Sequence, residues 1–281
     1  MDVIDAHIHL WRAEAAHPIW VRDAIGALPR TCTLDDYFAA SDAARAIVIE
    51  AAGTLAETVD LFEQFADDPR IAGVVGSMDL GAADLAPTLD RLAAFPRFKG
   101  VRLVTAFGSG QEVEDLAHGL SALAERGLTL DLLAAPAGLS VVGEIIAAAP
   151  GLTIVVNHCG RPLVMCGSSD RWDGAMTEIA SHPGTYCKLS GLIERAGFEW
   201  TTAELAPFVS RIVDLFGPDR LLFATNWPMC ELTGRAQRWK DALAVILAGI
   251  GLGPPQVGAI MGGNAARAYR VAPTAEAGSR A

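Results

Sequence analysis

This chain lacks the features that would assign it to several common classes of protein. Its five cysteines are scattered and form no Cys-x-x-Cys pair, which excludes a disulfide framework, a zinc ribbon and a thioredoxin-like site. It contains no run of about eighteen uncharged apolar residues, so we expect no membrane-spanning helix. Neither a G-x-G-x-x-G segment nor a P-loop is present, which leaves no recognisable cradle for a nucleotide phosphate.

Positive charge is also scarce. Lys and Arg number 22 against 33 Asp and Glu, and no basic cluster could follow a phosphate backbone, so we expect neither a nucleic-acid nor a membrane partner. The chain has only three lysines, and we expect Lys99 and Lys188, which sit in apolar runs, to bridge strands through buried pairs. The acidic start at Asp2 and Asp5 differs from a basic secretory signal, so we expect a cytoplasmic protein.

Short apolar runs alternate with helical patterns along almost the whole chain, and 51% of the residues are apolar, enough for a large core. The runs are rich in Val, Ile and Leu without polar alternation, which is typical of parallel strands covered on both faces. They predict strands at Asp2–Ile8, Ala46–Glu50, Ile71–Met78, Phe98–Val104, Leu128–Leu133, Thr153–Asn157, Thr185–Leu189 and Leu221–Thr225. Helices are predicted at Thr33–Ala43, Thr54–Ala66, Asp84–Phe95, Glu112–Arg126, Leu139–Ala148, Arg171–Ser181, Thr201–Phe216 and Arg235–Leu247.

Eight strand–helix units match the arithmetic of a (β/α)₈ barrel of about 250 residues. The alternative, an open doubly wound sheet, normally has fewer strands and a glycine-rich first turn. We therefore predict an α/β fold made of a single (β/α)₈ TIM barrel over residues 1–272, followed by a flexible C-terminal tail at 273–281. The sequence leaves the subunit count open, a homo-oligomer included.

Polar residues collect where the predicted strands end, and barrel enzymes carry their chemistry at that face. Burying polar groups is costly unless they are paired, so this concentration predicts a functional site. The residues are His7, His9, Glu50, Arg102, Asp131, Asn157, His158, Lys188, Ser190 and Asn226.

Histidines are the sharpest part of this set. His7 and His9 are two residues apart on one strand, so both rings point to the same side and form half of a common metal site. The alternative is a pair of core histidines bonded to backbone carbonyls. His158 ends a distant strand and predicts a third convergent imidazole, while Asp5, on the same face, is expected to orient a ring.

Six segments occur in the order and spacing of a known family: Asp5–Trp11, Lys99–Arg102, His158–Pro162, Lys188–Leu192, Leu221–Pro228 and Gly263–Arg267. In these the chain resembles the lactonase branch of the amidohydrolase superfamily. The resemblance implies a (β/α)₈ fold and a carboxylic-ester hydrolase that opens a small acidic or sugar-derived lactone with water. It matches His7, His9 and His158 to catalytic histidines, and Arg102 and Arg161 to positions that hold anionic substrate groups.

The resemblance does not decide whether a metal cofactor is needed, because some members of the branch are similar to zinc enzymes and others hydrolyse without a bound ion. If a divalent metal is present, His7, His9 and His158 with Glu50 would make a His₃Glu site, for which zinc is the best candidate. For Glu50 the alternative is a buried salt bridge to an Arg or Lys.

One position departs from the family. Its last strand usually ends Ser-Asp-Trp-Pro, whereas this chain reads Thr225-Asn226-Trp227-Pro228. An amide has no titratable proton acceptor, so Asn226 cannot take a proton from water as a carboxylate would. Asn226 is either a natural variant that positions water beside another base, with Glu50 the leading candidate, or an engineered Asp replacement, or a sign of lost catalysis.

Aromatic side chains flank the expected mouth, where Trp11, Trp20 and Trp227 could stack on a sugar or unsaturated lactone ring; simple loop packing is the alternative.

The sequence leaves two other functions open: a metal-dependent decarboxylase of the neighbouring branch, and a catalytically silent ligand-binding barrel. Those decarboxylases tend to follow the later histidine with Gly-Gly, whereas Cys159 and Gly160 follow it in this chain, which favours the lactonase.

Overall fold

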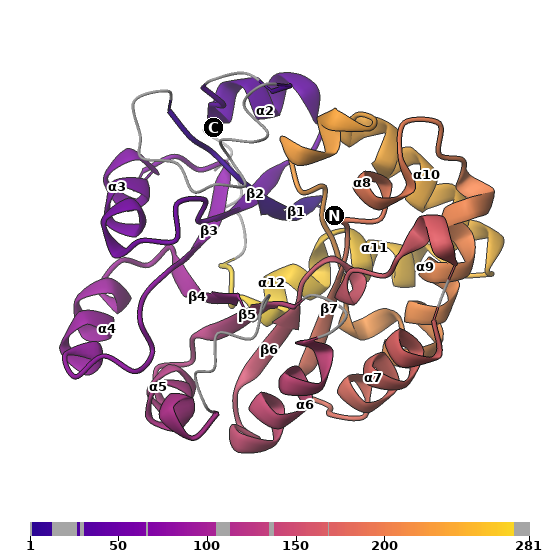
Figure 1. The fold of residues 1–281 in the computed structure, drawn as a ribbon. Coiled ribbons are helices and arrows are strands. Elements are labelled where there is room, and N and C mark those ends of the chain that lie inside the picture. The colour runs from indigo at the N-terminus through magenta and orange to yellow at the C-terminus, as the bar shows by residue number, and fades with distance from the viewer. Residues whose placement is uncertain are drawn as a thin grey trace.

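The structure, a computed structural model, describes residues 2–12, 27–28, 31–65, 67–104, 113–134, 138–167 and 169–272, so that Trp20 and the predicted tail lie outside it. Eight parallel strands form one sheet in sequence order and are ringed by helices (Figure 1). The strands are β1 (Ile4–Ile8), β2 (Arg45–Ile49), β3 (Ile71–Gly76), β4 (Phe98–Val104), β5 (Thr129–Leu133), β6 (Thr153–Val156), β7 (Thr185–Leu189) and β8 (Leu221–Phe223). The predicted (β/α)₈ barrel is confirmed.

The helices of the described chain also follow the predicted pattern. They are α2 (Leu34–Ala40), α3 (Leu55–Phe65), α4 (Leu85–Ala93), α5 (Val113–Glu125), α6 (Leu139–Ala148), α7 (Asp170–Ala180), α8 (Ile193–Ala196), α9 (Thr202–Phe216), α10 (Ala236–Gly249), α11 (Pro254–Gly258) and α12 (Asn264–Ala268). Capping explains where two of these helices begin: Thr33 forms a capping box before α2, and Thr201 forms one before α9. None of these helices is long and apolar enough to span a bilayer.

The core has two parts that the barrel wall separates. The larger lies between the strands and the surrounding helices, and the smaller fills the barrel interior with residues such as Ile4, Ala72 and Val155. Ala265 and Ala268 of α12, followed by Tyr269, belong to the interior cluster. The residues that follow α12 accept hydrogen bonds from the starts of strands, since Arg45 donates to the carbonyl of Ala272 and Lys99 to that of Arg270. The polar end of the barrel is therefore the opposite, carboxyl end.

The barrel closes where β1 meets the chain that follows β8. The amide of Asn226 donates to the carbonyl of His7 at 2.9 Å, and the amide of His9 donates to the carbonyl of Trp227 at 2.7 Å. A parallel bridge joins Ile8 to Trp227. His7, His9 and Asn226, which the sequence predicts to be catalytic, therefore also form the seam where the barrel closes.

Asp5 corrects one expectation, because it binds neither imidazole. The pairing of β1 with β2 shifts register between Asp5 and Ile8, which breaks the simple alternation that placed Asp5 beside the rings. Its carboxylate accepts hydrogen bonds from the backbone amides of His7 and Thr225, and from the hydroxyls of Tyr37 and Thr225. Asp5 thus joins β1 to α2 and to the segment that follows β8.

Candidate active site

The predicted polar end exists, and it is buried. The ten strand-end residues singled out from the sequence are all at most 9% exposed: His7, His9, Glu50, Arg102, Asp131, Asn157, His158, Lys188, Ser190 and Asn226. Because buried polar groups need partners, the hydrogen bonds among these residues define the chemistry of the centre.

Three imidazoles meet at this centre. The ring centroids of His7 and His9 lie 4.8 Å apart, and those of His7 and His158 lie 4.5 Å apart. The Nε2 atoms of His7 and His9 are separated by 3.1 Å, and Nδ1 of His158 lies 2.8 Å from the hydroxyl oxygen of Ser190. The spatial convergence of β1 and β6 histidines expected from the sequence is therefore present.

The partners of the first two rings fix where their protons sit. Nδ1 of His9 lies 3.0 Å from the carbonyl oxygen of Ile49, which can only accept, so His9 donates from Nδ1 and accepts at Nε2. Nδ1 of His7 lies 3.1 Å from the ammonium nitrogen of Lys188, which can only donate. His7 therefore accepts at Nδ1 and donates from Nε2 to His9, so a chain of hydrogen bonds runs from Lys188 to Ile49.

Lys188 is buried beside an acidic partner. Burial lowers the pKa of its ammonium group, and the charge of Asp131 opposes that effect. Its ammonium nitrogen lies 2.5 Å from a carboxylate oxygen of Asp131, and both side chains are fully buried. The hydroxyl of Tyr269 donates to the other oxygen of Asp131 at 2.8 Å. The buried pair expected for Lys188 is thus confirmed, and its contact with His7 makes it part of the site as well. Lys99, by contrast, donates to the backbone carbonyl of Arg270.

Burial keeps the imidazoles neutral. It lowers the pKa of His7 well below its usual range, and the charge of Lys188 lowers that pKa further. Burial and the charge of Arg102 together lower the pKa of His9 to about 3. The pKa of His158 is also well below its usual range, because of burial and then Lys188 and Arg161. All three rings can thus serve as neutral donors or acceptors at neutral pH.

The backbone around His158 and Asn226 adopts the left-handed conformation that favours glycine. The φ angles are 57° at His158, 53° at Cys159, 55° at Arg161 and 62° at Asn226. Five non-glycine residues of the described chain have a positive φ, and these are four of them. Such conformations are held at a cost and cluster at functional sites, so their concentration supports a site at the ends of β6 and β8.

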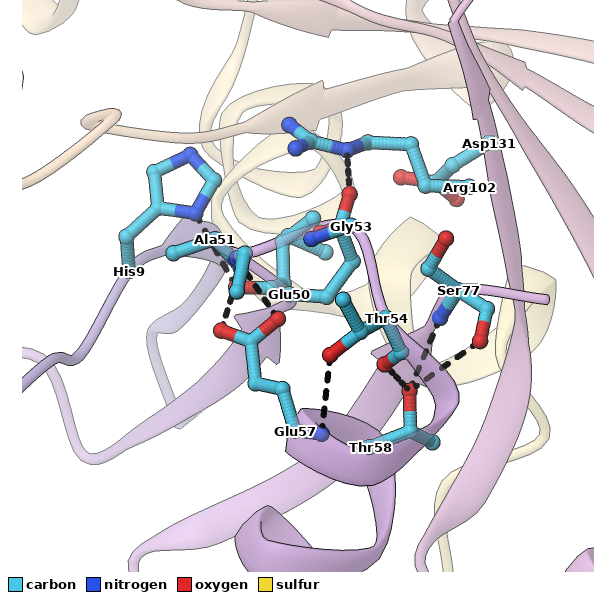
Figure 2. Close-up of polar contacts among 12 residues, drawn as sticks. His9, Glu50, Ala51, Gly53, Thr54, Glu57, Thr58, Ser77, Arg102 and Asp131 are labelled. Carbon is cyan, nitrogen blue, oxygen red and sulfur yellow. Dashed lines mark hydrogen bonds and ion pairs between the residues drawn. The ribbon is translucent and has the colours of Figure 1, made fainter. Parts of the chain in front are cut away.

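Glu50 and Arg102 form a buried ion pair, which is the alternative that the sequence left open for Glu50. Nε of Arg102 donates to one oxygen of Glu50 at 2.5 Å, and the amide of Gly53 donates to the other at 2.6 Å. Figure 2 shows the two terminal nitrogens of Arg102 turned away from Glu50, toward the side where His9 lies. Arg102 can therefore bind an anionic or carbonyl oxygen while it stays paired.

A metal ion does not fit these residues as they are arranged. A ligating imidazole carries its proton on the nitrogen away from the metal, as His9 does. His7 cannot do so while Lys188 donates to its Nδ1. Within the described ranges, no group of three His, Cys, Asp or Glu side chains is placed to hold an ion.

The remaining predicted binding residues differ in their accessibility. Arg161 is half-buried, and burial lowers its pKa, with a further effect from Arg195. Trp11 and Trp227 are only 5% and 4% exposed and belong to the hydrophobic core, where Trp227 packs edge-on against Tyr37. The loop-packing alternative describes these two tryptophans.

Two side chains of the site have buried polar atoms without partners among the described residues, a feature that the sequence alone does not reveal. Oε1 of Glu194, on the short helix α8, accepts a hydrogen bond from Nδ2 of Asn226 at 2.7 Å, while its Oε2 is buried without a partner in the described part of the chain. Both side-chain polar atoms of Asn157 are also buried and unpaired there. Unpaired buried polar atoms indicate where a water molecule or ligand belongs.

A parallel barrel whose carboxyl end gathers imidazoles, guanidinium groups and a carboxylate with one oxygen unpaired among the described residues is a barrel enzyme with a hydrolytic type of site. The sequence matches the amidohydrolase family over residues 4–271, and the chain belongs to that family.

Relatives agree with this assignment. An L-fucono-1,5-lactonase of Burkholderia ambifaria is 30% identical over 276 residues, which cover 95% of each chain. A crystal structure of an amidohydrolase from Burkholderia multivorans with bound zinc has a TM-score of 0.86 and 29% identity, and it covers 97% of this chain and 100% of that one. A probable 2-pyrone-4,6-dicarboxylic acid hydrolase from Acinetobacter baumannii has a TM-score of 0.76, covers 96% of this chain and 100% of that chain, and at 17% identity shares the fold.

Proposed function

We propose that this chain is a lactone hydrolase that opens a small sugar-derived or acidic lactone by water attack at the barrel mouth. The observation that carries the proposal is the convergence of neutral His7, His9 and His158 beside Arg102 in a buried polar centre. The likeness to L-fucono-1,5-lactonase over almost the whole chain supports the same reaction and favours a sugar-derived ring.

His7 is suited to stabilise the negative charge that develops on the carbonyl oxygen. Its Nε2 carries a proton, and the Lys188 ammonium at Nδ1 makes that proton a stronger donor. When the substrate binds, the Nε2 proton turns from His9 to the carbonyl oxygen. The terminal nitrogens of Arg102 and the guanidinium of Arg161 bind hydroxyl or carboxylate groups of the substrate.

A zinc ion is the family-based alternative, and the relative whose crystal structure contains zinc supports it. On His7, His9, Glu50 and His158, this ion would require His7 to turn away from Lys188. We further propose that the protein works in the cytoplasm, which its five free cysteines support. Its partner is a small-molecule lactone rather than a macromolecule. Trp11 and Trp227 support the site through their packing in the hydrophobic core.

A lactone panel tests the function. Acid release is followed by pH-stat with aldono-1,4- and 1,5-lactones and with a pyrone dicarboxylate, and carbon dioxide release is measured in parallel with aromatic carboxylic acids. Ring opening by the native chain is the expected result. Carbon dioxide release would instead identify a decarboxylase, and silence of both the native chain and Asn226→Asp would identify a ligand-binding barrel.

A further inference from the structure

Hydrolysis needs a group that takes a proton from the attacking water, and most buried carboxylates of the site are already occupied. Both oxygens of Asp5, Glu50 and Asp131 accept hydrogen bonds from other residues. Each oxygen of such a carboxylate already has a partner, and the hydrogen bonds that it accepts stabilise the charged form, which makes it a weaker proton acceptor.

The first two imidazoles are equally engaged. Lys188 and His9 occupy the two nitrogens of His7, and the Ile49 carbonyl and His7 occupy those of His9. Burial also lowers the pKa values of these two rings and of His158, which makes all three imidazoles weak proton acceptors. The proton acceptor is therefore expected elsewhere in the site.

Glu194 has the free oxygen that the other carboxylates lack. Oε1 is held by the Asn226 amide at 2.7 Å, whereas Oε2 is buried and unpaired among the described residues. Its position is central: Asn226 also donates from its backbone amide to the carbonyl of His7 at 2.9 Å. The loop that leads to Glu194 is packed on His158, since a Cβ at Gly191 would lie 2.4 Å from the Cβ of His158.

We propose that Glu194 is the general base of the lactone hydrolysis and that Asn226 positions it, an inference that rests on the proposed function. Oε2 takes one proton from water while the water oxygen bonds to the carbonyl carbon. The bond between that carbon and the ring oxygen then breaks, and the ring oxygen takes the proton from Glu194. The products are the open hydroxy acid and the regenerated carboxylate.

The charges around Glu194 agree with this role. Among the described residues, the titratable groups that interact with Glu194 include Arg195 on its own helix, Arg161 after β6 and Cys230 on the 3₁₀ turn Met229–Leu232. Burial raises the pKa of Glu194 to about 7, although the Asn226 hydrogen bond and the two arginines act in the opposite direction. A general base works best with a pKa near the working pH. The rate is therefore expected to rise with pH through about 7, as Glu194 loses its proton.

The test uses four variants of the full chain on a lactone that the native chain opens. Glu194→Gln keeps the acceptor for Asn226 and removes the base, and we expect kcat to fall by about 10²–10⁴-fold with KM nearly unchanged. The double variant Glu194→Gln/Asn226→Asp exchanges the positions of amide and carboxylate, and it is expected to recover part of the loss. Asn226→Asp alone places two carboxylates together and should move the acid limb of the pH profile upward. Exposed Glu199→Gln, which makes the same charge change nearby, is the control.

The outcomes separate this proposal from the proposed function. If the native chain opens no lactone, the proposed function fails and the base fails with it. If the native chain is active and Glu194→Gln keeps kcat within about threefold, only the base is overturned. Should Glu194→Gln fail to fold, the pH profile of the native chain decides: an acid limb near 7 supports Glu194, and a flat profile from about pH 5 to 8 overturns it.

Discussion

The ammonium nitrogen of Lys188 lies 3.1 Å from Nδ1 of His7, although 181 residues separate the two in the sequence. This contact decides which nitrogen of His7 carries the proton, because an ammonium group can only donate. It directs the proton of His7 toward the centre of the site, where it can stabilise a developing oxyanion. The same contact opposes the binding of a metal ion at Nε2 of His7, because a metal ion needs a lone pair on the nitrogen that here carries the proton.

Metal content is the first testable consequence. We expect the chain, purified without chelator, to hold far less than one equivalent of zinc, and we expect EDTA to leave kcat unchanged. Elemental analysis combined with rates before and after chelation provides the measurement. One bound zinc per chain, with activity that disappears on chelation and returns with zinc, would show that His7 turns away from Lys188 in solution.

The buried pair of Lys188 and Asp131 should matter for stability. Lys188→Met leaves the Asp131 charge uncompensated in the interior and is expected to lower the free energy of unfolding by about 3–5 kcal/mol. Urea unfolding followed by circular dichroism measures this difference. Lys240→Met is the matched control, because its partner Asp42 is 60% exposed and such pairs contribute about 0–1 kcal/mol. Equal effects of the two substitutions would contradict the prediction.

The three neutral imidazoles should make the fold sensitive to acid. Their folded pKa values lie below the unfolded value of 6.5, so the unfolded chain binds more protons below that pH. Their contribution is present above pH 6.5 and is lost as pH falls, by about 1.4 kcal/mol per pH unit for each ring. For His9 the loss continues to about pH 3.

Urea midpoints measured from pH 8 to pH 4 test this slope. His9→Gln is expected to reduce the slope of stability against pH by the contribution of one ring, about 1.4 kcal/mol per pH unit. His118→Gln on α5, where the ring is exposed, should leave it unchanged. A slope that is the same in both variants would show that His9 is not held neutral by the fold.

Arg161 should determine how well an acidic substrate binds. Arg161→Gln removes a charged donor that is half-buried near Glu194, and we expect KM for a carboxylated lactone to rise by about 10- to 100-fold. KM for a neutral sugar lactone should change much less, and kcat for both should stay within a few-fold. A similar rise for both substrates would mean that Arg161 holds a ring hydroxyl instead.

Most of the barrel could be predicted because its signals are local. Apolar runs and caps such as Thr33 and Thr201 placed strands and helices close to their observed ends. The convergence of His7, His9 and His158 followed from strand direction alone, since parallel strands end at one face.

The partners of these residues could not be predicted in the same way. The contact between Lys188 and His7 depends on how the whole sheet curves, and the register shift after Asp5 has no local signal. Glu194 was missed because α8 is four residues long and shows no periodic pattern. Its role is visible only from the oxygen left unpaired after folding.

The seam of the barrel has a kinetic consequence. The amides of Asn226 and His9 close the circle of strands, and the same residues surround the reacting centre. Opening this seam would therefore dismantle the site without unfolding the rest of the wall. A substrate analogue that bridges the two sides is expected to slow deuterium uptake at these amides more than anywhere else, so hydrogen exchange would report occupancy directly.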